Sequence, residues 1–262
     1  MAEATPTEIY NRAKQEGERR LFMPPLEQIS TGFIAGVTIV FGIVALATAQ
    51  HLVEPAMGVG PGKLVGALAF GIGLVFLIIG RSELFTENFF GPVAAAIDRR
   101  QSAAWVRLAR LWGLILLLNL LGGAVMAAVF VVEGALPSGA HQVLSSMAEE
   151  INGKSGPATF MRAVAAGTLL TLLSYLLHAV TSSASRIALA YLAGVFLALG
   201  AFDHVVVTAL HLLAGLWLGA QVTYPELALH ILLVGAGNLV GGVLLMTLTH
   251  TAQAKGAGPR RK

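Results

Sequence analysis

The chain has 262 residues, of which 56% are hydrophobic and 12% are charged, against roughly 45–50% and 25% in soluble domains. This composition predicts a protein with several membrane spans and little room for a soluble domain. The absence of cysteine excludes disulfides, thiolate metal sites and cysteine nucleophiles. The formal charge is only +3, and basic clusters in such a chain indicate membrane topology rather than nucleic-acid binding.

The first 29 residues are polar and charged, with an amphipathic pattern near 9–21 that is typical of a short surface helix. No small-residue cleavage site follows the first apolar stretch, so we expect no removable signal peptide. We expect three regions: a cytoplasmic N-terminal segment over 1–29, a transmembrane channel domain over 30–250, and a basic cytoplasmic tail over 251–262.

Apolar stretches of about 20 residues, the length that crosses a bilayer, recur six times. They lie near residues 30–50, 62–85, 104–132, 158–181, 187–219 and 227–249. The segment 136–157 reads as an external loop with a short helix around 141–151. If the N-terminus is inside, thirteen of the 17 Lys and Arg residues face the cytoplasm, so the positive-inside rule predicts that both termini are cytoplasmic.

Two pairs of similar segments indicate an internal repeat. NLLGG at Asn119–Gly123 recurs as NLVGG at Asn238–Gly242. Polar residues also interrupt the second span, in GRSELFTEN from Gly80, and the fifth span, in GAFDHVVVT from Gly200, at a similar offset. Halves of three spans each must enter the membrane from opposite sides, which gives an inverted 3+3 repeat with its substrate site where the halves meet.

A helix that breaks inside a bilayer leaves backbone N–H and C=O groups without partners unless they face protein or water. The two breaks should therefore line a pathway. Half-helices that begin after such breaks direct the positive ends of their dipoles at the cavity, which favours an anion.

The chain resembles the formate/nitrite transporter family across all six spans. The resemblance rests on Leu84–Thr86 after an acidic residue, on Phe202–His204, and on Gly237 and Asn238 with the glycine pair that follows. It implies an all-α, aquaporin-like protomer with broken second and fifth helices within a homopentamer. Family members carry formate, nitrite or hydrosulfide, and the resemblance implies no cofactor and no metal.

The same resemblance implies roles for four polar residues on the pathway. Thr86 is similar to the threonine that hydrogen-bonds substrate and the central histidine, and His204 is similar to that histidine. Thr171 and Thr208 stand at positions that are usually asparagine in formate channels, and both still offer hydroxyl groups.

Further positions are similar to the family's constrictions and vestibule. Phe70 matches the cytoplasmic constriction, Leu197 is its fifth-span counterpart, and Leu84 matches the periplasmic constriction. Lys154, in the loop before the fourth span, resembles a vestibule lysine that attracts anions.

Charged residues within the spans are expected to stabilise the breaks, because a charge at the bilayer centre costs about 3 kcal/mol or more. We expect Glu83 and Asp203 to anchor their loops and Arg81 to pair with a carboxylate. The rival interpretation has Arg81 attracting anions in a vestibule. Arg81, Glu87 and Asn88 depart from the formate and nitrite branches and leave the substrate open.

The expected function is a channel or transporter in the cell (inner) membrane for small monovalent anions of weak acids. Transport is either proton-linked through His204, or His204 stays neutral and only positions Thr86. Alternatives are a conduit for neutral solutes and a non-conducting structural protein. Six spans with Ser and His also suit an intramembrane serine protease, but no serine has a nucleophile setting. His178 and His211 lack comparable context, and we expect both to serve packing.

Overall fold

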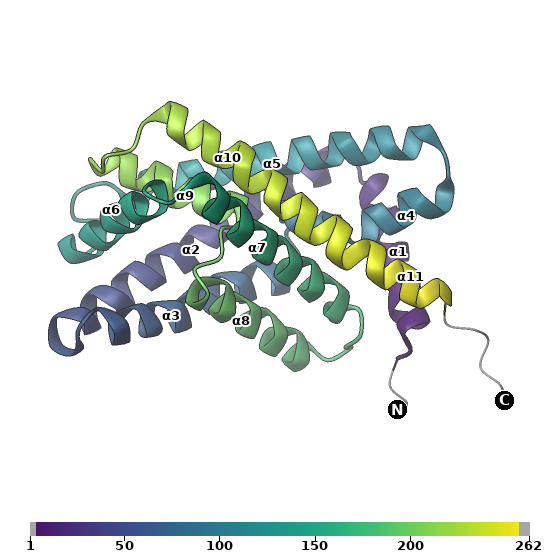
Figure 1. Ribbon diagram of the computed structural model, residues 1–262, viewed down its shortest axis with the longest axis horizontal. Coiled ribbons are helices and arrows are strands. Elements are labelled where there is room, and N and C mark those ends of the chain that lie inside the picture. Colours follow the sequence, from purple (N-terminus) through teal and green to yellow (C-terminus); the bar gives the residue numbers. More distant parts are fainter. Residues whose placement is uncertain (1–3, 257–262) are drawn as a thin grey trace.

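The structure, a computed structural model, describes residues 4–256, which are almost entirely helical (Figure 1). In chain order the elements are α1 (Pro6–Leu21), α2 (Pro25–Met57), α3 (Val59–Ile79), η1 (Phe85–Phe89), α4 (Gly91–Arg99), α5 (Ser102–Phe130), α6 (Ser138–Asn152), α7 (Gly156–Leu177), α8 (Ser183–Leu199), α9 (Val205–Trp217), α10 (Tyr224–Leu239), η2 (Val240–Thr247) and α11 (Leu248–Gly256).

The helices supply the six predicted spans. α2, α3, α5, α7 and the continuous helix from α10 to α11 are each long and apolar enough to cross a bilayer. α8 and α9 have 17 and 13 residues, so they form the fifth span only together. The second span breaks after α3, where residues 80–90 precede the short helix α4. Both predicted breaks are therefore present.

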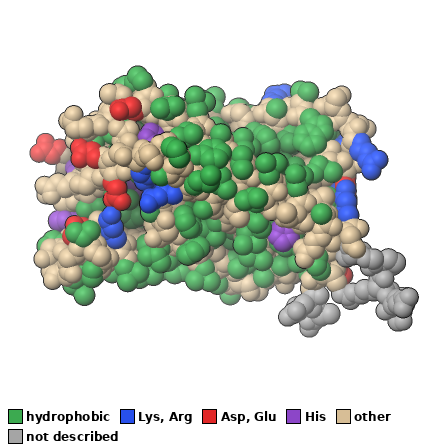
Figure 2. Space-filling view, in the orientation of Figure 1, with side chains coloured by type: hydrophobic (Ala, Val, Ile, Leu, Met, Phe, Trp, Pro, Cys, Tyr) green, Lys and Arg blue, Asp and Glu red, His purple; other side chains and the backbone are tan. Residues whose placement is uncertain are grey.

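The spans run along the long axis of the molecule, so its two ends correspond to the two membrane faces (Figure 1). α1, α4 and α11 lie together at one end, which we call the α1 side, and α6 lies at the other end, the α6 side. Charged side chains gather at the two ends, with a wide apolar band between them (Figure 2). Leu192 and Leu232 in the spans are more than 60% exposed. Such a surface suits contact with lipid or with another membrane protein.

The N-terminal helix α1 packs across the α1 side of the bundle. Its first turn is closed by a capping box between Thr5 and Glu8. Gly17 touches α4 so closely that a Cβ there would lie 2.0 Å from the carbonyl carbon of Gly91. The end of the predicted tail, residues 257–262, lies outside the described residues.

The two halves repeat the same close helix crossings. Where α2 crosses α5, a Cβ on Gly36 would lie 2.1 Å from the carbonyl oxygen of Asn119. Where α7 crosses α10, a Cβ on Gly167 would lie 2.2 Å from the carbonyl oxygen of Asn238. Small residues let membrane helices approach this closely. The predicted inverted repeat is thus visible in the packing.

Candidate solute pathway

Asn119 on α5 holds the break in the second span. Its Nδ2 donates hydrogen bonds to the carbonyl oxygens of Gly32, at 2.8 Å, and of Glu83, at 2.9 Å. Its Oδ1 accepts from the backbone N–H of Phe85 at 2.9 Å. One buried side chain thereby satisfies three backbone groups, two of them at the break, which is what an interrupted helix in an apolar environment requires.

Asn238 on α10 does the same for the fifth span. Its Nδ2 donates to the carbonyl oxygens of Ala163, at 2.8 Å, and Asp203, at 3.0 Å, and its Oδ1 accepts from the N–H of Val205 at 2.9 Å. These three bonds reproduce the pattern around Asn119, so the repeat extends to individual hydrogen bonds.

The two broken spans meet at the Thr86–His204 pair, which the sequence had singled out. Thr86 Oγ1 lies 2.9 Å from His204 Nε2, and both residues are fully buried. His204 also caps α9, because its Nδ1 accepts from the N–H of Val207 at 3.4 Å. In the neutral imidazole this leaves the hydrogen on Nε2, which donates to Thr86. The hydroxyl hydrogen of Thr86 is then available to a solute.

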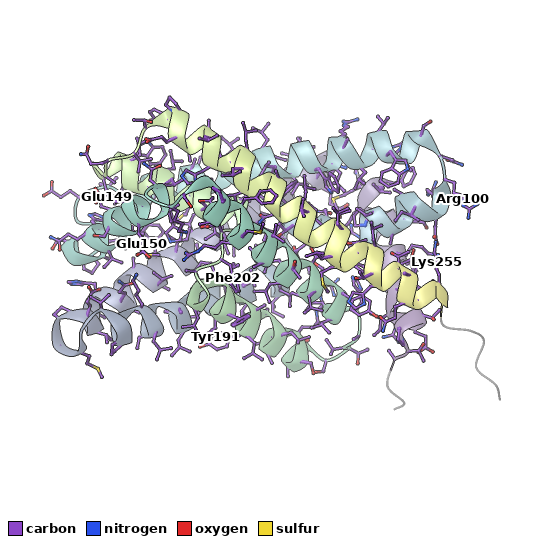
Figure 3. The ribbon with its side chains drawn as sticks, in the orientation of Figure 1. Arg100, Glu149, Glu150, Tyr191, Phe202 and Lys255 are labelled. Atoms are coloured by element: carbon purple, nitrogen blue, oxygen red, sulfur yellow. The ribbon has the colours of Figure 1, made fainter. Side chains whose placement is uncertain are left out.

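A cavity of about 160 Å³, which we call the α6-side cavity, opens between the loop before α9 and the helices α3 and α6. Buried Phe70 and Leu197 line its inner part, and half-exposed Lys63 and Glu150 line its mouth. Glu150 comes from α6, and Phe202 comes from the loop before α9 (Figure 3). The wall of this cavity also includes Thr208 and His211 on α9 and the ion pair formed by Lys154 and Asp203.

Lys154, for which the family resemblance implied a vestibule role, lines this cavity and faces a carboxylate. Its Nζ is 2.7 Å from Oδ1 of Asp203, and both side chains are largely buried. Asp203 therefore anchors its loop through an ion pair with Lys154 and through the carbonyl bond to Asn238. The charge of Lys154 is neutralised by this partner.

A second space, the α1-side hollow, has a volume of about 790 Å³. It lies between α1, the loop 80–90 and the end of α7 near α8. Its charged lining residues are Arg12, Glu16, Arg19, Arg20, Glu27, Arg81, Glu83, Glu87 and Arg186. His178 also lines it, and burial together with the positive charge of Arg20 lowers the pKa of this histidine to about 4.

Arg20 of α1 is the partner of the acidic residues in the second-span loop. Its Nε lies 3.0 Å from Oε1 of Glu83, and its guanidinium also donates to the carbonyl oxygen of Glu87 at 3.1 Å. The Glu87 carboxylate accepts from the N–H of Leu84 at 3.1 Å and so closes the N-terminal end of the short helix η1. Glu83 and Glu87 thus serve the structure of the loop, and the N-terminal helix is tied to it.

The predicted pairing of Arg81 with a carboxylate is wrong. Arg81 has no ion pair within residues 4–256, because Arg20 and Arg19 occupy the position beside Glu83. Its backbone is left-handed, with φ of 53°, and its carbonyl oxygen accepts from the hydroxyl of Thr31 at 3.3 Å. Arg81 lines the α1-side hollow, and the rival interpretation, in which it attracts anions in a vestibule, stays a prediction.

The structure also reverses the sides of the two predicted constrictions. Phe70 lines the α6-side cavity. Leu84 lies in the chain between Glu83 and Glu87, and both of these residues line the α1-side hollow. With cytoplasmic termini, Phe70 and Leu197 face the outside and Leu84 faces the cytoplasm. The physical reason is chain direction, since the second span starts at the face opposite the N-terminus and reaches residue 70 first.

The two threonines at the asparagine positions of formate channels lie in different surroundings. Thr208 lines the α6-side cavity and is 3% exposed. Thr171 is fully buried, and its Oγ1 would be 2.4 Å from a Cβ on Gly242. Its hydroxyl therefore faces the backbone of η2 rather than the cavity that contains Thr208.

Sequence reasoning missed the roles of two residues, one that lines a cavity and one that supports a loop. His211 lines the α6-side cavity, although we expected it to serve packing. Asn88 also supports its loop: its Nδ2 donates to the carbonyl oxygen of Leu84 at 3.0 Å, and its own carbonyl oxygen accepts from Trp112 Nε1 at 3.1 Å. The seven-residue spacing of His204 and His211 on one helix was the available signal.

Comparison with known proteins agrees with the resemblance. The family model described as Formate/nitrite transporter matches residues 7–252. Inner membrane protein YfdC of Escherichia coli K12 is 24% identical over 94% of this chain and 78% of its own.

Two solved structures share the fold. An FNT family ion channel superposes with a TM-score of 0.80 at 21% identity, over 94% of this chain and 99% of its own. A pentameric formate channel with formate bound superposes with a TM-score of 0.69 at 19% identity, over 92% and 98%.

Proposed function

Because the chain belongs to the formate/nitrite transporter family, we propose that it conducts small monovalent anions of weak acids, such as formate or nitrite, across a membrane. The observation that carries the proposal is the buried hydrogen bond between Thr86 and His204, which joins the two broken spans. Glu87, next to Thr86, lines the α1-side hollow, and Asp203, next to His204, lines the α6-side cavity. The pair therefore marks the crossing point of the path.

The chemistry at the crossing point suits a weak acid. An isolated carboxylate loses its hydration between apolar side chains such as Phe70, Leu84 and Leu197 at a prohibitive cost. A proton taken up from the aqueous side removes most of that cost. In the tautomer set by Val207, His204 stays neutral and orients Thr86, whose hydroxyl hydrogen binds an oxygen of the solute.

We further propose that residues 30–250 form the channel domain in an inner membrane, with residues 1–29 and the tail 251–262 in the cytoplasm. The distribution of Lys and Arg supports this orientation. The similar protein of Escherichia coli carries the name inner membrane protein. A homopentamer is the proposed assembly, because the similar formate channel is pentameric.

The second transport candidate is a conduit for neutral solutes, which the ion pair between Lys154 and Asp203 favours because it leaves little free charge in the α6-side cavity. Flux in proteoliposomes under a defined pH gradient separates the two, with formate, acetate, nitrite, hydrosulfide, lactate and urea as solutes. We expect at least one weak acid to enter faster than into empty vesicles, and faster as the external pH falls. Urea entry without pH dependence would indicate the neutral conduit. No flux from folded oligomers would contradict both and favour a structural role.

A further inference from the structure

The α1-side hollow contains more cationic side chains than its carboxylates pair with. Its charged lining residues are five arginines and four glutamates. Three of the glutamates are ion-paired with Arg19 or Arg20, namely Glu16, Glu27 and Glu83. The fourth, Glu87, accepts from the N–H of Leu84. Three arginines of the hollow therefore have no ion pair within residues 4–256, namely Arg12, Arg81 and Arg186.

Two of these guanidinium groups lie close to each other at the end of α7. Arg12 on α1 donates to the carbonyl oxygen of His178 at 3.3 Å, and Arg186 on α8 donates to that of Leu177, also at 3.3 Å. The two carbonyl groups belong to consecutive residues, and cations are favoured at the C-terminal end of a helix. Such a bond uses one of the five N–H donors of a guanidinium, so both side chains are positioned and still have donors for a ligand.

The third guanidinium, that of Arg81, is not needed for the break in the second span. The backbone of Arg81 is left-handed, with φ of 53°, a conformation that costs free energy in a residue with a side chain. The corresponding residue of the other half is Ala201, which has φ of 50°. An alanine therefore fulfils the same backbone role. Strained residues of this kind gather at functional sites, and the side chain of Arg81 lines the hollow.

The size and the charge of the hollow fit a larger anion than the conducted solute. Its volume of about 790 Å³ is about five times that of the α6-side cavity and lies within the range of small-molecule sites. Burial lowers the pKa of His178 in its wall to about 4, and the guanidiniums of Arg20, Arg186 and Arg12 add to this effect. A monovalent anion would neutralise one of the three unpaired arginines. A phosphate monoester carries up to two negative charges, and guanidinium groups bind phosphate in a bidentate manner.

We propose that the α1-side hollow binds a soluble organic phosphate or polyphosphate with two or more negative charges, held by Arg12, Arg81 and Arg186, and that this ligand obstructs the path from that side. The binding site goes beyond the proposed function. The obstruction rests on that function, because the hollow is lined by Glu87, the neighbour of Thr86 in the chain.

The first test measures binding without flux and uses pyrophosphate as the probe. Titration calorimetry of the full-length oligomer in detergent, at pH 7.5 and constant ionic strength, should show saturable binding. Arg81→Gln and Arg186→Gln should each raise the Kd about tenfold, because each removes a charge-assisted hydrogen bond. Arg162→Gln is the matched control: Arg162 also donates to a carbonyl oxygen, that of Ala201 at 3.4 Å, but does not line the hollow.

Three results of this titration would overturn the proposal. The first is no saturable binding to the wild type, and the second is a Kd that is the same in Arg81→Gln and Arg186→Gln as in the control. The third is displacement of pyrophosphate by an equal concentration of formate, which would show that the hollow does not select polyvalent anions. The titration is repeated in nanodiscs of phosphatidylcholine and of phosphatidylglycerol, where we expect equal Kd values. Binding lost in phosphatidylglycerol alone would assign the site to lipid headgroups and contradict a soluble ligand.

The second test uses His178 as a reporter inside the hollow. An anion beside an imidazole stabilises its protonated form, so bound pyrophosphate should raise the pKa of His178. Nitrogen-15 NMR of the wild type, assigned by comparison with His178→Asn, measures this pKa. Formate at the same ionic strength should leave it unchanged. A pKa that does not move with saturating pyrophosphate would contradict binding in the hollow.

The third test concerns the obstruction. Pyrophosphate on both faces of proteoliposomes should slow formate entry through the wild type, and the half-maximal concentration should rise about tenfold in Arg186→Gln, as the Kd does. Entry that is unaffected by saturating pyrophosphate would exclude the obstruction. A wild type that binds pyrophosphate but conducts no solute would sink the proposed function and keep the binding site.

Discussion

At the scale of single residues, two asparagines form hydrogen bonds with the backbone at the breaks of the two interrupted spans. Asn119 and Asn238 are fully buried and each makes three hydrogen bonds to backbone groups of other segments. A backbone group that loses its hydrogen-bond partner inside a bilayer finds no water molecule to take the partner's place. Both breaks therefore depend on one amide each.

We expect Asn119→Ala and Asn238→Ala each to lower stability by about 3 kcal/mol, because a buried unpaired group costs roughly 1–3 kcal/mol. Thermal unfolding of the purified protein in detergent measures the loss. Asn152→Ala is the control, since the bond that Asn152 donates to the carbonyl oxygen of Gln221 is exposed to solvent. Unfolding temperatures that match the wild type would show that the breaks are held by other groups.

His178, at the end of α7, makes stability depend on pH. Burial and the charge of Arg20 lower its pKa from 6.5 to about 4. Between these values the unfolded chain binds a proton that the folded chain does not, so stability decreases as pH falls from 6.5 to 4 and is independent of this residue above that window. His178→Asn should lessen the drop in unfolding temperature between pH 7 and pH 4.5. An identical drop would exclude His178 as a source.

At the scale of elements, α1 belongs to the same structural unit as the loop it covers. Its Arg20 is paired with Glu83 in a nearly buried contact and also binds the carbonyl oxygen of Glu87. Gly17 and Gly91 bring α1 against α4 without intervening side chains. The loop with Thr86 thus depends on a helix that lies outside the spans.

We expect Arg20→Gln to expose α1 to hydrogen exchange and to lower stability by about 3 kcal/mol, because it leaves Glu83 as a buried charge without its main partner. Lys14→Gln is the control: its ion pair with Asp98 is more exposed and contributes about 1 kcal/mol or less. Equal rates of hydrogen exchange in α1 for the two variants would contradict the claim that the buried pair of Arg20 and Glu83 anchors this helix.

At the scale of the whole molecule, the two halves should respond alike to equivalent changes. Gly36→Ala and Gly167→Ala would each place a Cβ about 2 Å from a carbonyl oxygen of the crossing helix. Overpacking of this kind costs about 1–3 kcal/mol or more. Gly113→Ala is the control, because a Cβ there meets no atom within 4 Å. Thermal unfolding should show two similar losses and no loss in the control, and a loss in one half alone would argue against equivalent halves.

The spans, the two breaks and the contact of Thr86 with His204 could be predicted from sequence. Span length, the repeated NLxGG and the polar interruptions are local patterns, and the family resemblance connected them. The partner of the loop could not be predicted, since Arg20 and Glu87 are 67 residues apart and nothing in either segment identifies the other. The prediction for Arg81 was wrong for the same reason. The position of His211 on the pathway became evident only from the cavity that it lines.

The most direct test of the account is the initial rate of formate entry into proteoliposomes at several pH values, for the wild type and His204→Ala. Removing His204 leaves Thr86 without its buried partner and without its orientation. We predict wild-type entry above that of empty vesicles, rising as the pH falls, and a loss of about tenfold or more in His204→Ala with the oligomer intact. Entry that ignores pH and survives His204→Ala would contradict the central claim.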